Sequence, residues 1–178
     1  RSDYPHLKMH YEFASIASSQ IRLGIVQHVL TVVNSLGLNE VELVALLQDI
    51  GETALAENIE SQNSIRAVFA GLAKLMEITG LDRIHLHARG YYLAITKRQY
   101  AGRETTLKGL LMSATLAASR ALTGRIGTDA EIAQGLDVPI SETGLTKVKE
   151  LADALAAKEL AERGHTDLGQ LCIAMVPT

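Results

Sequence analysis

One stretch of the sequence constrains the fold more than any other, because an apolar run gives way there to a helix start. Residues 30–38 are mainly apolar, and Asn39 and Glu42 follow them. Asn is a favoured N-cap residue, and Glu three positions later completes a capping box. The pattern therefore predicts an extended segment over residues 30–38 and a helix over residues 40–50. The N-terminus of such a helix favours a phosphate or a metal–phosphate group, and a capping role does not exclude this use.

Periodicity along the rest of the chain predicts alternating strands and helices. Strands are predicted at residues 6–14, 83–87, 91–96 and 170–176, and helices at residues 20–29, 52–59, 63–79, 105–122, 129–135 and 145–163. This order predicts an α/β layered domain with a mainly parallel sheet flanked by helices. The carboxyl ends of parallel strands meet at one edge, so we expect segments 6–14 and 83–92 to lie at the same edge as Asn39.

Composition narrows the class of protein. Hydrophobic residues make up 47% of the chain and aromatic residues 4%, so the core must be aliphatic. The net charge of −3 gives no electrostatic signature for nucleic acid. Cys172 is the only cysteine, which excludes an intrachain disulfide and a thiolate metal cluster and suits a reducing cytoplasm. No apolar run is long enough to span a membrane. The chain starts at Arg1 without Met, and we expect it to be a piece of a longer protein.

Two pairs of polar residues are spaced to share a strand face. These are His10 with Glu12 and His85 with His87, each two residues apart. Either pair is frequent by chance, and together they also allow a zinc site of a metal-dependent hydrolase. Tyr91 and Tyr92, which follow Gly90, are suited to stacking on a base, although strand tyrosines are usually half-buried packing residues.

Four motifs in this order resemble one family. They are His-x-Glu-Phe-Ala-Ser at 10–15, Gly-Leu-Asn-Glu-Val-Glu-Leu at 37–43, Arg-Ile-His-Leu-His-x-x-Gly-Tyr-Tyr-Leu at 83–93 and Val-Pro-Thr at 176–178. Together they are similar to the ADP-dependent sugar kinases, the archaeal-type ADP-dependent glucokinases and phosphofructokinases. The resemblance covers nearly the whole chain and implies a ribokinase-like fold.

The resemblance also implies roles for individual residues. Glu12 and Glu42 would hold Mg²⁺, directly or through water, and Asn39 would touch ADP. His87 and Ala88 would border the adenine, partly through the backbone. The reaction implied is transfer of the β-phosphoryl group of ADP to glucose or fructose 6-phosphate, with release of AMP.

Other parts of the family pattern are missing from these 178 residues. The catalytic Asp of the family's Gly-x-Gly-Asp motif would lie beyond Thr178, and the sugar-binding lid and the first strands would precede Arg1. The resemblance thus implies that residues 1–178 are the C-terminal-side part of the large nucleotide-binding domain. We expect this chain alone to be inactive and the remainder of the same protein to be its partner. A non-catalytic relative that acts as a binding module remains the alternative.

Overall fold

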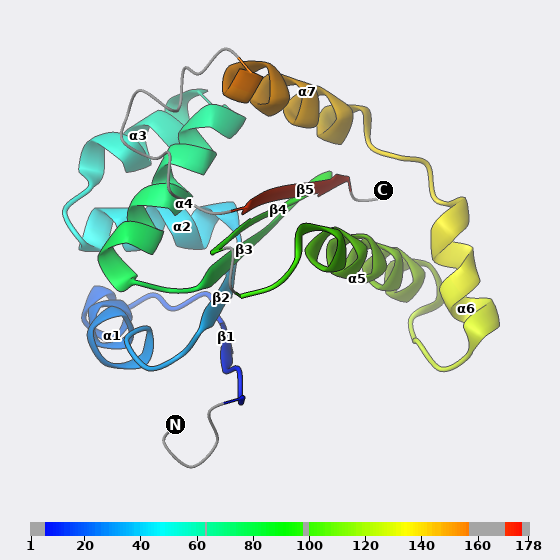
Figure 1. Ribbon diagram of the computed structural model, residues 1–178, viewed down its shortest axis with the longest axis horizontal. Coiled ribbons are helices and arrows are strands. Elements are labelled where there is room, and N and C mark those ends of the chain that lie inside the picture. Colours follow the sequence, from blue (N-terminus) through cyan, green and yellow to red (C-terminus); the bar gives the residue numbers. More distant parts are fainter. Residues whose placement is uncertain (1–5, 63, 98–99, 157–169, 176–178) are drawn as a thin grey trace. The chain divides into compact units, whose positions relative to one another are not determined.

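A computed structural model describes residues 6–62, 64–97, 100–156 and 170–175 (Figure 1). The chain forms two compact units, residues 1–86 and residues 87–178. No helix among the described residues is long and apolar enough to cross a membrane.

The first unit alternates strands and helices. Its elements are β1 (His10–Glu12), α1 (Ser19–Gly24), the π-helical turn η1 (Ile25–Val29), β2 (Ser35–Leu38), α2 (Glu40–Asp49), α3 (Thr53–Gln62), α4 (Ile65–Thr79) and β3 (Arg83–Ala88), whose last two residues enter the second unit. β2 pairs in parallel with β1 and with β3, in the register His10 to Ser35 to Arg83. The helices α2, α3 and α4 pack against one another.

Leucine dominates the core of this unit. Every residue of β2 is buried, which is typical of a parallel strand with a neighbour on each side. The helices contribute an apolar stripe each, with Leu43, Leu46 and Leu47 from α2 and Leu72 and Leu75 from α4, all with no exposed surface. Asn34 joins the amino ends of the strands, because its side chain accepts from Met9 N–H at 3.1 Å and donates to Asp82 at 2.8 Å.

The second unit contains an antiparallel strand pair with helices. Its elements are β4 (Tyr91–Thr96), α5 (Arg103–Thr123), α6 (Asp129–Gln134), the 3₁₀ turn η2 (Gly135–Asp137), α7 (Glu142–Ala156) and β5 (Gln170–Met175). β4 pairs with β5, and α5 packs on both strands. Gly90 lies in the turn before β4 with a φ of +93°, a conformation that glycine adopts without strain.

The layered α/β fold predicted from the sequence is confirmed. Its strand pairing is mixed rather than mainly parallel, because the first unit has parallel pairs and the second has an antiparallel pair. The boundaries of α2 and α4 also agree with the predictions, and Gly51 and Gly80 follow these helices with positive φ.

Three boundaries were predicted wrongly. Residues 30–34 are not extended, because Leu30 ends the π-helical turn and Val33 N–H bonds back to Val29 O. Of the apolar residues in this run, Leu30 is buried at the helix end and Val32 is exposed. β1 is shorter than predicted, and α7 begins at Glu142 rather than at residue 145. The predicted end of that helix at Gly164 and the Val-Pro-Thr segment lie outside the described residues.

Candidate functional site

The carboxyl ends of β1 and β2 place Glu12 over the backbone of Gly37. These two residues are register partners, and Phe13 N–H donates to Gly37 O at 2.8 Å just beyond them. A Cβ atom built on Gly37 would lie 2.0 Å from Glu12 Oε2. The missing side chain at position 37 therefore makes the space in which the Glu12 carboxylate lies.

The N-terminus of α2 carries the capping box that the sequence predicts. Asn39 Oδ1 accepts from Glu42 N–H at 2.9 Å, and Glu42 Oε2 accepts from Asn39 N–H at 2.9 Å. The other oxygen of Glu42 accepts from the Ser15 hydroxyl at 3.2 Å, and Glu42 is only 6% exposed. Its carboxylate is thus held by two elements, the start of α2 and the loop after β1.

We use the name carboxylate cluster for five neighbouring residues of the first unit: His10, Glu12, Ser15, Asn39 and Glu42. His10 Nε2 lies 3.0 Å from Glu12 Oε2. Glu12 lies at the carboxyl end of β1, and Glu42 lies in the first turn of α2, which directly follows the neighbouring strand β2. The dipole at this helix N-terminus favours negative charge. Oxygen donors of this kind suit a hard cation, and the helix N-terminus suits phosphate.

The carboxylate cluster offers oxygen donors but not a complete metal-binding group. Among the described residues, no three His, Cys, Asp or Glu side chains gather as a complete metal-binding group. Mg²⁺ is usually bound through one or two carboxylates, with waters and substrate phosphates completing its shell. Glu12 and Glu42 therefore fit Mg²⁺ carried by a phosphate ligand better than a metal held by protein alone.

The zinc arrangement of His10, Glu12, His85 and His87 gains no support from the part of the chain that is described. No such group of ligands is found there. His10 also has both ring nitrogens within hydrogen-bonding distance of protein partners, Glu12 and Ser35.

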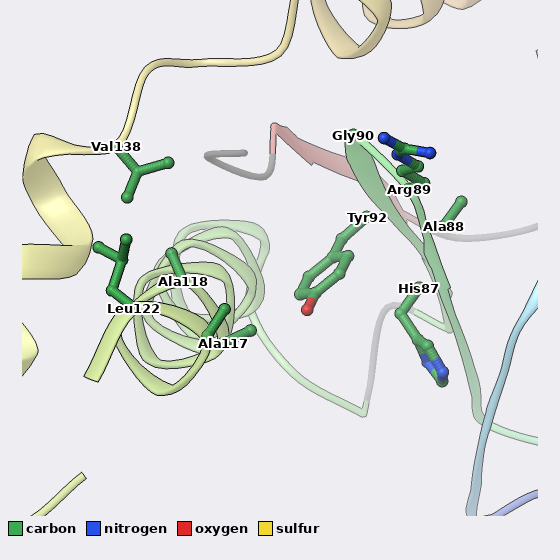
Figure 2. A pocket seen from close by; sticks show the side chains of 10 residues that line it. His87, Ala88, Arg89, Gly90, Tyr92, Ala117, Ala118, Leu122 and Val138 are labelled. Carbon is green, nitrogen blue, oxygen red and sulfur yellow. The ribbon is translucent and has the colours of Figure 1, made fainter. Parts of the chain in front are cut away.

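A pocket of about 510 Å³ lies in the second unit (Figure 2). One wall is the turn between β3 and β4 with its flanks, the other is α5, and Val138 closes a third side. The lining residues are His87, Ala88, Arg89, Gly90, Tyr92, Ala117, Ala118, Ala121, Leu122 and Val138. The volume falls within the range of small-molecule sites, and the lining is mainly apolar.

The walls of this pocket suit a flat aromatic ligand. The Tyr92 ring points from β4 towards α5 and meets His87 edge-on, with ring centroids 6.4 Å apart and an interplanar angle of 77°. Three alanines of α5 line the opposite wall, and their small side chains take up little of the pocket. Aromatic rings and small side chains leave a slot for stacking, with the backbone of residues 87–90 at its edge.

The predicted site residues thus fall into two groups. The structure brings Asn39 and Glu42 into direct contact and places Glu12 at the end of the adjacent strand. His87 and Ala88 line the pocket of the second unit. Sequence reasoning missed Ser15, because a serine in a loop carries no signal for its partner. The alanine spacing in α5 was visible, but it predicts close helix packing as readily as a pocket wall.

Known proteins match nearly the whole chain. A sequence profile described as "ADP-specific Phosphofructokinase/Glucokinase conserved region" matches residues 2–177. The ADP-dependent glucose/glucosamine kinase of Pyrococcus abyssi is 41% identical over 175 residues, which are 97% of this chain and 37% of that protein. The ADP-specific phosphofructokinase of Methanosarcina acetivorans is 36% identical over 172 residues, which are 93% of this chain and 34% of that protein. The chain spans just over a third of the length of these relatives.

Solved structures agree with the sequence relatives. An ADP-dependent kinase in complex with fructose-6-phosphate and ADPbetaS matches with a TM-score of 0.89 and 30% identity, over 99% of this chain and 41% of that one. A phosphofructokinase from Pyrococcus horikoshii OT3 with AMP matches with a TM-score of 0.84 and 27% identity, over 97% of this chain and 37% of that one. The ribokinase-like fold implied by the four motifs is therefore confirmed. With a profile match from residue 2 to residue 177, the chain belongs to the ADP-specific phosphofructokinase/glucokinase family.

Proposed function

We propose that this chain supplies the Mg²⁺- and nucleotide-binding part of an ADP-dependent sugar kinase. The reaction is transfer of the β-phosphoryl group of ADP to a sugar hydroxyl, with release of AMP. The observation that carries the proposal is the position of Glu12 at the end of β1, next to the end of β2 that leads into the Asn39–Glu42 capping box, in a chain of this family.

Glu12 and Glu42 would hold the metal. Bound Mg²⁺ would bridge phosphate oxygens and offset their negative charge. Both oxygens of Glu42 already accept hydrogen bonds, from Ser15 and Asn39, which favours contact through water for this residue. Glu12 has a side chain that is 56% exposed, which favours a direct role.

Asn39 and the second-unit pocket would bind the nucleotide. Asn39 Oδ1 accepts in the cap, so its Nδ2 group is the donor suited to ADP. His87 and Ala88 would border the adenine, and the Tyr92 ring with the alanines of α5 supplies surface on which a purine can stack. Phosphoryl transfer depends mainly on positioning and charge neutralisation, so these contacts would supply much of the catalysis.

The remaining elements of the enzyme would come from the rest of the same protein. Residues 1–178 would be the C-terminal-side part of the large domain, and a catalytic Asp beyond Thr178 and a sugar-binding lid would complete the site. Relatives are named for glucose and glucosamine or for phosphofructokinase activity, so both glucose and fructose 6-phosphate are candidate acceptors. We expect a cytoplasmic enzyme, and we expect this chain alone to be inactive.

Binding of Mn²⁺, an EPR-active substitute for Mg²⁺, in the presence of ADP tests the metal role. In the full-length natural protein, Glu12→Gln is expected to weaken Mn²⁺ binding by about 10-fold or more, because it removes a charged oxygen ligand. Glu77→Gln is the matched control, since Glu77 lies in the same unit, has a 59% exposed side chain and forms an ion pair with Lys74. Equal Mn²⁺ affinity in Glu12→Gln and wild type would show that Glu12 is not a ligand.

A further inference from the structure

A row of three polar residues crosses the parallel strands of the first unit. His10 on β1 is the register partner of Ser35 on β2, and Ser35 is the register partner of Arg83 on β3. Register partners on neighbouring strands lie on the same face of a sheet. Two residues further along, the next row on this face begins with Glu12 and Gly37.

Hydrogen bonds connect the row from end to end. Arg83 Nη1 donates to Ser35 Oγ at 3.1 Å, Ser35 Oγ lies 2.9 Å from His10 Nδ1, and His10 Nε2 lies 3.0 Å from Glu12 Oε2. Ser35 has no exposed surface, so its hydroxyl depends on these protein partners.

The chemistry of the end groups sets the direction of these bonds. Arg83 can only donate, so it uses one of the two acceptor sites of Ser35. Among the described residues, His10 Nδ1 is the acceptor that the buried Ser35 hydrogen can reach, so Ser35 donates to it. A neutral imidazole whose Nδ1 accepts carries its hydrogen on Nε2. That hydrogen faces Glu12 Oε2, and an ionised carboxylate can only accept. The opposite tautomer would set the Nε2 lone pair against the carboxylate.

We propose that Ser35 and Arg83 are positioning residues that hold His10 as the Nε2–H tautomer and thereby fix the orientation of the Glu12 carboxylate for Mg²⁺·ADP. This inference rests on the proposed function, because it assigns the row to the metal-binding role of Glu12.

Glu12 has an anchor in His10. Its side chain is 56% exposed, and the residue beneath it is Gly37, which offers no side-chain wall. An exposed glutamate loses rotamer freedom when it binds a ligand, and fixing it beforehand removes part of that entropic cost. The anchor itself is rigid, because it starts from a fully buried serine on a strand that is paired on both sides.

The tautomer of His10 can be measured directly. Histidine-labelled full-length protein without metal or nucleotide, at about pH 8, gives ring ¹⁵N shifts that distinguish Nε2–H from Nδ1–H. His10→Gln identifies the resonance. We expect the Nε2–H form, and a loss of this preference in Ser35→Ala. An Nδ1–H or doubly protonated ring in the wild type would overturn the inference without any variant having to fold.

Mn²⁺ binding in the presence of ADP tests the consequence. Ser35→Ala and Arg83→Met are expected to weaken Mn²⁺ affinity by about 3- to 10-fold, less than the loss of Glu12 itself, because they act one step removed from the ligand. Arg83→Lys keeps a donor and is expected to restore part of the affinity. Ser119→Ala is the matched control, since Ser119 is equally buried and donates to Glu131 O in the second unit.

The outcomes separate this inference from the proposed function. If Glu12→Gln weakens Mn²⁺ binding while Ser35→Ala and Arg83→Met do not, the proposed function survives and the inference is wrong. If Glu12→Gln binds Mn²⁺ as the wild type does, the proposed function is wrong at Glu12, and the positioning role falls with it.

Discussion

At the scale of single residues, some groups of the candidate metal site could be predicted from the sequence and others could not. Asn39 and Glu42 form a local motif, so their capping box was predictable from spacing alone. Ser35 and Arg83 were not, because their roles follow from strand register, which brings together residues 48 positions apart. Gly37 was visible in a motif, but the need for a glycine there follows only from the position of Glu12.

Replacement of Gly37 by alanine tests the space under Glu12. The added Cβ would lie 2.0 Å from Glu12 Oε2, so the carboxylate must move. Because this carboxylate ends a flexible, largely exposed side chain, we expect Gly37→Ala to change the free energy of unfolding by less than about 1 kcal/mol. We expect it to weaken Mn²⁺ binding in the presence of ADP, and denaturant unfolding and titration measure the two effects.

Gly71→Ala is the control for this prediction. Its Cβ would lie 2.9 Å from Leu47 Cδ1, also in the first unit but among apolar side chains. We expect it to cost stability and to leave Mn²⁺ binding unchanged. Wild-type Mn²⁺ affinity in Gly37→Ala would contradict the placement of Glu12.

At the scale of elements, both ends of α2 form hydrogen bonds with the segment that follows β1. Ser15 bonds to Glu42 near the N-terminus of α2. At its C-terminus, Asp49 accepts from Arg22 Nε at 2.6 Å, from Arg22 Nη2 at 3.0 Å and from Ser19 Oγ at 2.7 Å. Arg22 Nη1 also donates to Ile16 O at 2.6 Å. These bonds hold the loop that carries Ser15 in place beside Glu42.

The ion pair between Arg22 and Asp49 predicts a pH-dependent stability. Burial alone would raise the pKa of Asp49, but the hydrogen bonds from Arg22 and Ser19 outweigh it and hold the pKa below its ordinary value. The stabilisation is therefore complete above the unfolded-state pKa of about 3.9 and is lost as the pH falls through the lower folded-state pKa. We expect Asp49→Asn to lower the free energy of unfolding by about 2 kcal/mol at about pH 7 and by much less near pH 2.

Denaturant unfolding of both proteins at the two pH values checks this prediction. Glu77→Gln, which alters an exposed ion pair with Lys74, should change stability by less than about 1 kcal/mol at either pH. A loss in Asp49→Asn that is the same at both pH values would show that the charge on Asp49 does not stabilise the fold.

Helices were predictable from the sequence where the apolar residues kept a helical spacing over many residues and a glycine followed the last turn. The helix α4 has buried residues along its whole length and ends at Gly80, so sequence and structure agree. Short elements were not predictable in the same way. In the segment from Leu30 to Val33, Leu30 is buried at a helix end while Val32 is 51% exposed. An apolar run of that length does not distinguish a helix end from a strand.

At the scale of the whole molecule, each compact unit carries its own candidate binding feature. The first unit contains the carboxylate cluster, and the second contains the pocket with His87 and Ala88. The sequence motifs predicted both groups of residues. The pocket itself was not predictable, because its walls come from the β3–β4 turn, α5 and Val138, which are distant in sequence.

Release of AMP is the measurement that tests the central claim most directly. The full-length natural protein would be incubated with ADP and Mg²⁺, with glucose or with fructose 6-phosphate, beside the 178-residue chain alone. The account predicts AMP and a phosphorylated sugar from the full-length protein with at least one acceptor, and none from the chain alone. Turnover by the isolated chain would contradict its assignment as a partial site. Absence of AMP from a folded full-length protein that binds Mn²⁺ and ADP would contradict the kinase function and favour a binding module.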